Sequence, residues 1–198
     1  MKFQKTKFIV GVDEVGRGPL AGPVMVCALG CEQILLSEFK EIKDSKMLTS
    51  KKRDEWFEKI NLKIKEGSVL CKISSLDNHT IDKVGISKSI KRCVDSSIFG
   101  LKIAPEEAEI LLDGGLKAPE IYLNQKTIIK GDQKETVISM ASVMAKVVRD
   151  REMEKLDLKY PNYGFAKHKG YGTKAHYEAI SHNGLCPLHR KSFCSKIL

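Results

Sequence analysis

The chain has 198 residues, six cysteines and a formal net charge of +9, and 42% of its residues are hydrophobic. These values predict one globular domain with a core that needs no disulfides, and no apolar run approaches the roughly 20 residues of a membrane span. The N-terminus lacks the apolar region of a secretory signal, so we expect a cytoplasmic protein with reduced cysteines, although an even cysteine count also permits disulfides. The basic surplus favours a polyanionic partner such as nucleic acid.

The first element is an apolar segment over residues 8–13, which predicts a buried strand ending in two adjacent acids, Asp13 and Glu14. Carboxylates at the end of a buried strand are costly to desolvate unless they bind a cation or form an ion pair. Arg17 follows between two glycines, where its planar guanidinium suits a phosphate and the backbone can approach a ligand closely. Carboxylates for a metal beside groups for a phosphate indicate phosphodiester chemistry.

The later elements mix strands and helices without a regular repeat. Apolar runs predict further strands over residues 23–29, 69–73, 110–113 and 127–129. Helical spacing predicts helices over residues 50–65, 79–99, 137–148 and 174–180, with an irregular basic tail from Ser181. The first two strands are joined so closely that they are expected to be antiparallel neighbours. The predicted fold class is α/β, with a mixed sheet flanked by helices.

Basic residues near the C-terminal half are expected at the surface. The face of the 137–148 helix opposite its apolar face is predicted to carry Lys146, Arg149 and Arg151. Arg190 and Lys191 either extend a nucleic-acid-binding face or belong to a solvated tail.

Two more acids, Asp113 and Asp132, stand where an apolar segment meets a glycine-containing loop or a helix start. Strand ends are where α/β sheets usually bind ligands, and clustered oxygen ligands select Mg²⁺ or Mn²⁺. Two such ions about 4 Å apart can activate a water and stabilise the leaving oxygen in phosphodiester hydrolysis. The alternative is that these acids form turns and cap helices, and Asp132 fits that alternative best because it precedes the long helix.

Ordered blocks along the whole chain resemble the type 2 ribonuclease H family, ribonuclease HII. The first block, at residues 11–24, reads GVDEVGRGPLAGPV. Further similar blocks follow in the family's order, at residues 44–46, 112–114, 130–132, 141–151, 160–165, 168–173 and 189–193. The departures are Val15, where alanine is usual, Met47, and residues 133–136 before the long helix. None of these departures removes one of the four acids.

The resemblance implies a ribonuclease H-like mixed sheet flanked by helices, in a single catalytic domain over residues 1–198 with a helical C-terminal extension from about residue 155. It implies an endonuclease that hydrolyses the RNA strand of RNA/DNA hybrids. It also implies cutting on the 5′ side of single ribonucleotides in duplex DNA, which leaves a 3′-hydroxyl and a 5′-phosphate.

The resemblance further implies the residues of the site. The catalytic carboxylates that bind two Mg²⁺ or Mn²⁺ ions would be Asp13, Glu14, Asp113 and Asp132. Residues expected to contact the 2′-hydroxyl, the sugar or nearby phosphates are Gly16, Arg17, Gly18, Lys46, Ser142 and Tyr171. Of these, Tyr171 would stack on the sugar at the RNA–DNA junction.

Two other functions compete with this prediction. A non-catalytic module would bind hybrid duplexes without metal-dependent turnover. A metal nuclease that acts only on DNA would not need a 2′-hydroxyl. For partners we expect RNA/DNA hybrids and ribonucleotide-containing DNA, no membrane, a monomeric state, and a sliding clamp as a candidate that contacts the tail at residues 192–198.

Overall fold

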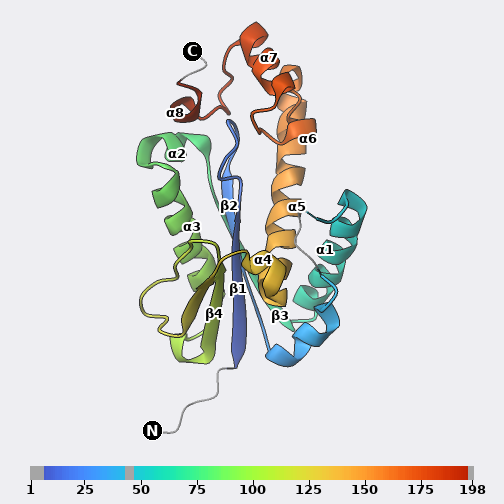
Figure 1. The fold of residues 1–198 in the computed structure, drawn as a ribbon, viewed down its shortest axis with the longest axis vertical. Helices are drawn as coiled ribbons and strands as arrows, with labels where there is room; N and C mark the ends of the chain where they lie inside the picture. The colour runs from blue at the N-terminus through green and yellow to red at the C-terminus, as the bar shows by residue number, and fades with distance from the viewer. Residues whose placement is uncertain (1–6, 43–46, 196–198) are drawn as a thin grey trace.

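The computed structural model describes residues 7–42 and 47–195, and its centre is a five-stranded sheet in the order β3-β2-β1-β4-β5 (Figure 1). The strands are β1 (Phe8–Val15), β2 (Val24–Cys31), β3 (Val69–Leu76), β4 (Ala108–Asp113) and β5 (Gln125–Ile128). β2 is antiparallel to both β1 and β3, whereas β4 is parallel to β1 and to β5. The predicted mixed sheet and the antiparallel first pair are therefore confirmed.

Helices cover both faces of this sheet (Figure 1). They are α1 (Ser50–Lys65), α2 (Asn78–Val84), α3 (Ile86–Gly100), α4 (Gly131–Lys134), α5 (Thr136–Lys159), α6 (Phe165–His168), α7 (Lys174–Asn183) and α8 (Lys191–Cys194). Short 3-10 helices lie at Gln33–Phe39, Pro105–Glu107 and Pro161–Tyr163. One core cluster lies under α2 and α3 and includes Val10, Val12 and Ile110. A second cluster lies under α1 and α5 and includes Trp56 and Leu111. Ile110 and Leu111 belong to different clusters because successive residues of a strand face opposite sides of the sheet. No helix in the described part of the chain is long and apolar enough to cross a membrane.

The start of α5 rests directly on β1. A Cβ on Gly11 would lie 2.2 Å from the carbonyl oxygen of Val137, so only glycine allows this approach. The contact fixes α5 against the strand that carries Asp13 and Glu14. Side chains one turn further along α5 are thereby held beside the two acids.

One predicted helix is two helices in the structure. Residues 79–99 belong to α2 and α3, which are separated by Gly85 at a φ of 84°. The helical spacing continued across this break because Ile81 and Ile90 pack into the same core cluster. The tail was expected to be irregular, but α7 extends to Asn183 and α8 follows.

The C-terminal helices α6, α7 and α8 form the predicted helical extension, beyond the upper end of β1 in Figure 1. They share a third apolar cluster with Leu20 and Ala21, which belong to the loop between β1 and β2. The backbone N–H of Leu20 donates to the carbonyl of Gly170, and the N–H of Arg190 donates to the carbonyl of Leu20. The C-terminal segment is therefore bonded to the glycine-rich loop that follows the first acids.

Candidate active site

Three of the four predicted carboxylates come from different elements. Asp13 lies near the end of β1 and Asp113 ends β4, and the parallel register that pairs Val12 with Leu112 sets the two acids side by side. The Asp113 Oδ1 accepts hydrogen bonds from the backbone N–H of Gly131 at 2.6 Å and of Asp132 at 3.4 Å. These bonds hold the first turn of α4, and with it Asp132, against the end of β4.

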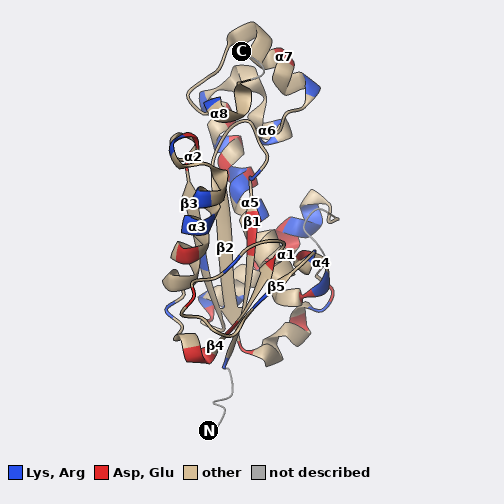
Figure 2. Cartoon of the chain, turned by 60° about the vertical axis from the view of Figure 1, so that its left-hand side comes forward, with Lys and Arg blue, Asp and Glu red and all other residues tan. Residues whose placement is uncertain are grey.

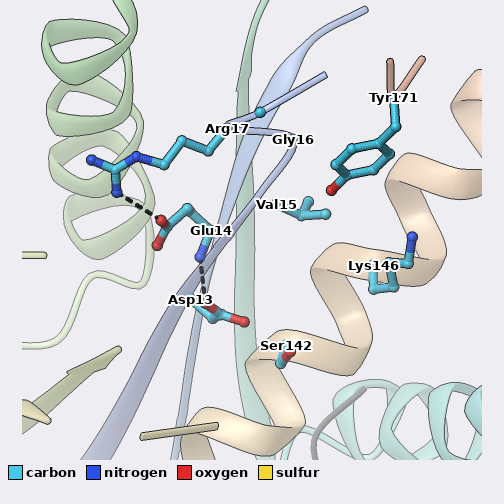
Figure 3. Close-up of a pocket in the computed structure, with 9 residues that line it drawn as sticks. Asp13, Glu14, Val15, Gly16, Arg17, Ser142, Lys146 and Tyr171 are labelled. Carbon is cyan, nitrogen blue, oxygen red and sulfur yellow. Dashed lines mark hydrogen bonds and ion pairs between the residues drawn. The ribbon is translucent and has the colours of Figure 1, made fainter. Parts of the chain in front are cut away.

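The carboxyl of Asp13 is only 6% exposed and is surrounded by negative charge. Burial raises its pKa to about 8, and the charges of Asp113, Glu14 and Asp132 act in the same direction, while a hydrogen bond with Ser142 opposes them. In Figure 3 Asp13 projects from β1 toward Ser142 on α5. Buried carboxylates that repel one another form a setting that a cation stabilises.

The donor set fits Mg²⁺ or Mn²⁺, because these ions prefer carboxylate oxygens and Asp132 is as buried as Asp13, at 4% exposure. Over residues 7–42 and 47–195, no three His, Cys, Asp or Glu side chains already stand close enough to form a complete ion-binding group. The structure thus brings the acids near one another, but their side chains are not arranged around a common ion position.

A pocket of about 370 Å³ opens beside Asp13 (Figure 3). Its lining residues are Asp13, Glu14, Val15, Gly16, Arg17, Gly18, Ser142, Lys146 and Tyr171. Seven of the ten predicted site residues therefore line one cavity. Asp113 and Asp132 lie outside the lining, and Lys46 lies outside the described residues. Figure 2 shows the acidic residues of β1 next to basic residues of α5.

Lys146 is a lining residue that was predicted only as part of a basic surface. It lies one helical turn after Ser142 on α5, and its Nζ donates to the Asp150 Oδ1 at 2.8 Å. The spacing of four residues between Ser142 and Lys146 was the signal that could have identified it.

Arg17 forms an ion pair with Glu14 across 3.1 Å, and its side chain is 55% exposed. An ion pair this exposed contributes little to stability. The guanidinium therefore remains accessible to a phosphate at the rim of the pocket.

Two fully buried arginines hold the glycine-rich loop from behind, and sequence reasoning missed both. Arg190 donates from Nη2 to the carbonyl of Gly16 at 2.7 Å, from Nη1 to that of Arg17 at 3.1 Å and from Nε to that of Gly22 at 3.0 Å. Arg149 donates to the carbonyls of Pro23, Ala21 and Lys169.

The predicted surface positions of Arg149 and Arg190 are wrong. A Cβ on Gly16, whose φ is 86°, would lie 2.3 Å from the Arg149 Nε, so the glycine makes room for the buried guanidinium. Arg149 continues a stripe of every fourth residue from Ala141 through Ala145, and that spacing indicated a buried position. No comparable local signal marked Arg190.

Tyr171 faces the pocket from a short segment held by two histidines. Its backbone N–H donates to the carbonyl of His168, and its carbonyl accepts from the Nδ1 of His176 at 2.9 Å. To donate this bond, Nδ1 of His176 must carry the single proton of a neutral ring. The Nε2 of His176 is then an acceptor, and it accepts from the Nε2 of His189 at 3.1 Å. The Nδ1 of His189 in turn accepts from the backbone N–H of Cys186. The network is complete only when both rings are neutral.

Acidification is therefore expected to destabilise the C-terminal helices. Burial lowers the pKa of His176 from 6.5 to about 4 and also lowers the pKa of His189. The unfolded chain then binds more protons below pH 6.5, so the stabilisation is complete above that pH and is lost as the pH falls toward 4. Between pH 7 and pH 5 we expect His176 alone to cost about 2 kcal/mol, measured by urea unfolding.

His176→Phe should remove most of this pH dependence, whereas His182→Phe, a change at an exposed position on α7, should leave it unchanged. An unaltered pH dependence in the His176 variant would contradict the neutral network.

Comparisons with known proteins identify the relatives of this chain. A family model described as Ribonuclease HII matches residues 10–196. Ribonuclease HII of Caldicellulosiruptor saccharolyticus is 44% identical over 192 residues, which cover 97% of this chain and 89% of the relative.

Two solved structures share the fold. Ribonuclease HII in the PCNA:RNase HII complex from Archaeoglobus fulgidus has a TM-score of 0.74 and 25% identity, and covers 92% of this chain and 93% of its own. Bst-RNase HIII in complex with Mn²⁺ has a TM-score of 0.66 and 21% identity, and covers 91% of this chain and 64% of its own. The chain belongs to the ribonuclease HII family, and it is a metal-dependent endonuclease with ribonuclease H activity on RNA/DNA hybrids.

Proposed function

We propose that the pocket beside Asp13 cuts on the 5′ side of single ribonucleotides in duplex DNA, as well as within the RNA strand of hybrids, and leaves a 3′-hydroxyl and a 5′-phosphate. The proposal treats residues 1–198 as one catalytic domain. One observation carries it: two of the four acids, Asp13 and Glu14, line the same cavity as Gly16–Gly18 and Tyr171. A protein distinguishes RNA from DNA by contacting the 2′-hydroxyl, and such contacts here would lie directly beside the acids.

Asp13, Glu14, Asp113 and Asp132 would hold two Mg²⁺ or Mn²⁺ ions. When bound, such ions supply a nucleophile at neutral pH and stabilise the leaving oxygen of the phosphodiester. That Bst-RNase HIII, which shares this fold, forms a complex with Mn²⁺ supports the proposal of a divalent ion. The repulsion around the buried Asp13 carboxyl is the feature of this chain that such ions would relieve.

The other lining residues would bind and orient the substrate. The planar guanidinium of Arg17 suits bidentate contact with a phosphate, and Ser142 and Lys146 add a hydroxyl and an ammonium on the α5 side. Tyr171, 42% exposed, has a ring face available for stacking on a sugar. A phosphate contact by Lys46 rests on the family resemblance alone.

The direct test is cleavage of a labelled DNA duplex that carries one ribonucleotide, with Mg²⁺, Mn²⁺ or EDTA, beside an all-DNA duplex. We expect metal-dependent cutting 5′ of the ribonucleotide and an intact control. Tight binding without cutting would favour the binding-module alternative. Cutting of the all-DNA duplex at a similar rate would favour the DNA nuclease.

Tyr171→Ala should reduce kcat/KM for the single-ribonucleotide duplex by about 10- to 100-fold, the size expected when one aromatic stacking contact is lost. Tyr171→Phe keeps the ring and should retain most activity if stacking dominates. An equal loss in both variants would assign the effect to the hydroxyl. If Tyr171→Ala barely altered the preference for ribonucleotide-containing duplex, this role of Tyr171 would be wrong.

For partners, we propose a monomer that contacts a sliding clamp through the C-terminal tail. The support is the relative that forms a complex with PCNA. Within the described part of this tail, Cys194 is fully buried and Phe193 packs against Arg190, whereas Ser192 and Ser195 are exposed. Residues 196–198 lie outside the described part of the chain.

A further inference from the structure

A second groove, of about 320 Å³, lies on the other side of Arg17 from Tyr171. It runs between α3 and the segment that follows β4, and its lining residues are Arg17, Ser87, Ile90, Lys91, Val94, Gly115, Leu116 and Lys117. Figure 3 shows the Arg17 side chain extending away from Tyr171 toward the green helix α3. The two cavities therefore meet at one guanidinium.

The charge of this groove is the reverse of that around Asp13. Three of its lining residues are cationic and none is acidic. Arg17 is paired with Glu14 and Lys91 with Asp95, but Lys117 has no hydrogen bond or ion pair to any residue in the described ranges. An exposed ammonium without a counter-ion is available to an external anion.

Lys117 is carried on a firmly held backbone. On one side, the N–H of Leu116 donates to the carbonyl of Asp113, and the Thr127 hydroxyl donates to the carbonyl of Leu116 at 2.8 Å. On the other side, the N–H of Ala118 donates to the Gln125 side chain at 2.9 Å. Since Lys117 follows Asp113 by four residues, its position is set relative to the candidate catalytic acids.

The floor of the groove is apolar and its mouth is open. Ile90, Val94 and Leu116 belong to the core cluster under α3. A Cβ on Gly115 would have no atom within 4 Å, so the bend after β4 leaves room for a bound group. An apolar floor with cations at its edges suits a sugar–phosphate backbone, whose sugars are weakly polar and whose phosphates are charged.

We propose that this groove binds a backbone phosphate of the substrate duplex beyond those at the cut, with Lys117 as its main contact. The inference rests on the proposed function only in taking a nucleic acid duplex as the substrate. Arg17 lines both cavities, so a nucleic acid strand that contacts Arg17 in the first pocket can continue into the second groove. No base is read here, so the contact should be independent of sequence.

The test measures equilibrium binding of a fluorescent duplex containing one ribonucleotide, by anisotropy, across a range of salt concentrations in EDTA. Lys117→Ala should raise Kd by about 3- to 10-fold and reduce the slope of log Kd against log salt by about 1, as expected for one lost phosphate contact. The double variant with Lys91→Ala should weaken binding further. The matched control is Lys65→Ala, an exposed lysine at the end of α1 on the other face of the sheet, which should change neither quantity.

Wild-type Kd and salt slope in both groove variants would overturn the inference, and so would an equal effect of Lys65→Ala. Cleavage is measured separately on the wild-type protein. If the wild type binds but does not cut, the proposed function fails while the groove is still judged by the binding data. If the wild type cuts and the groove variants bind normally, only the inference about the groove fails.

Discussion

Asp13→Asn should lower the rate of cleavage about 10³-fold or more, because metal ions contribute several kcal/mol to stabilising such transition states and each 1.36 kcal/mol is tenfold in rate. Asparagine matches the shape of aspartate but removes the negative charge that an ion needs. The measurement is single-turnover cleavage of the one-ribonucleotide duplex at saturating enzyme.

The same substitution should leave the fold intact. Asp13 is buried beside Glu14, Asp113 and Asp132, and its pKa is raised to about 8, so without a metal its carboxyl is already largely uncharged at pH 7 and a neutral asparagine leaves the sheet unchanged. Thermal unfolding of the variant should therefore occur at or above the wild-type temperature in EDTA. Asp54→Asn, at an exposed ion pair on α1, is the control with the same change of charge and should cut normally. Near-normal turnover by Asp13→Asn would refute the assignment of the site.

Arg190→Met should lower the free energy of unfolding by about 3 kcal/mol, because it removes the donor from two buried carbonyl groups and one part-buried carbonyl group, and each loss at a buried group costs about 1–3 kcal/mol. Relief of the desolvation that lowers the pKa of Arg190 to about 10 offsets part of this cost. Those carbonyls belong to Gly16, Arg17 and Gly22, so substrate binding should weaken as well.

Urea unfolding at pH 7 measures the stability, and kcat/KM measured well below the unfolding transition reports on the loop. Lys191→Met removes the neighbouring exposed charge and should shift the free energy of unfolding by less than about 0.5 kcal/mol. Arg190→Lys keeps a charge but cannot reach all three carbonyls, so it should lie between wild type and methionine. An Arg190→Met protein as stable as the wild type would show that the loop does not depend on this side chain.

The elements that could be predicted are those whose signal is local. α1 was predicted at Ser50–Lys65 and occupies those residues. The Thr49 side chain caps its first turn by accepting a hydrogen bond from the backbone N–H of Lys52, and Trp56 and Ile60 face the core. β1 was predicted from a short apolar run, and it extends through the two acids to Val15. The ends of elements were less predictable, as for α5, which continues to Lys159 beyond its apolar stripe.

Seven of the ten predicted site residues line one pocket, but the side chains that hold the loop behind that pocket were not predicted. Asp13, Glu14 and Arg17 stand together in the sequence, so their proximity needed no tertiary information. The burial of Arg190 depends on carbonyls more than 160 positions earlier in the chain, and no spacing within the tail indicates such a contact. Local sequence patterns do not predict side chains that form hydrogen bonds with backbone groups far away in the sequence.

The bonds from Arg190 also set an order of events during synthesis. The glycine-rich loop leaves the ribosome 173 residues ahead of the arginine that secures its carbonyls. Chains grow from the N-terminus at about 5–20 residues per second, so the loop waits roughly 10–35 s for this partner. A nascent chain that has already exposed Asp13 and Glu14 thus lacks the bonds that hold its glycine-rich loop, and any truncation before residue 190 leaves the chain without them.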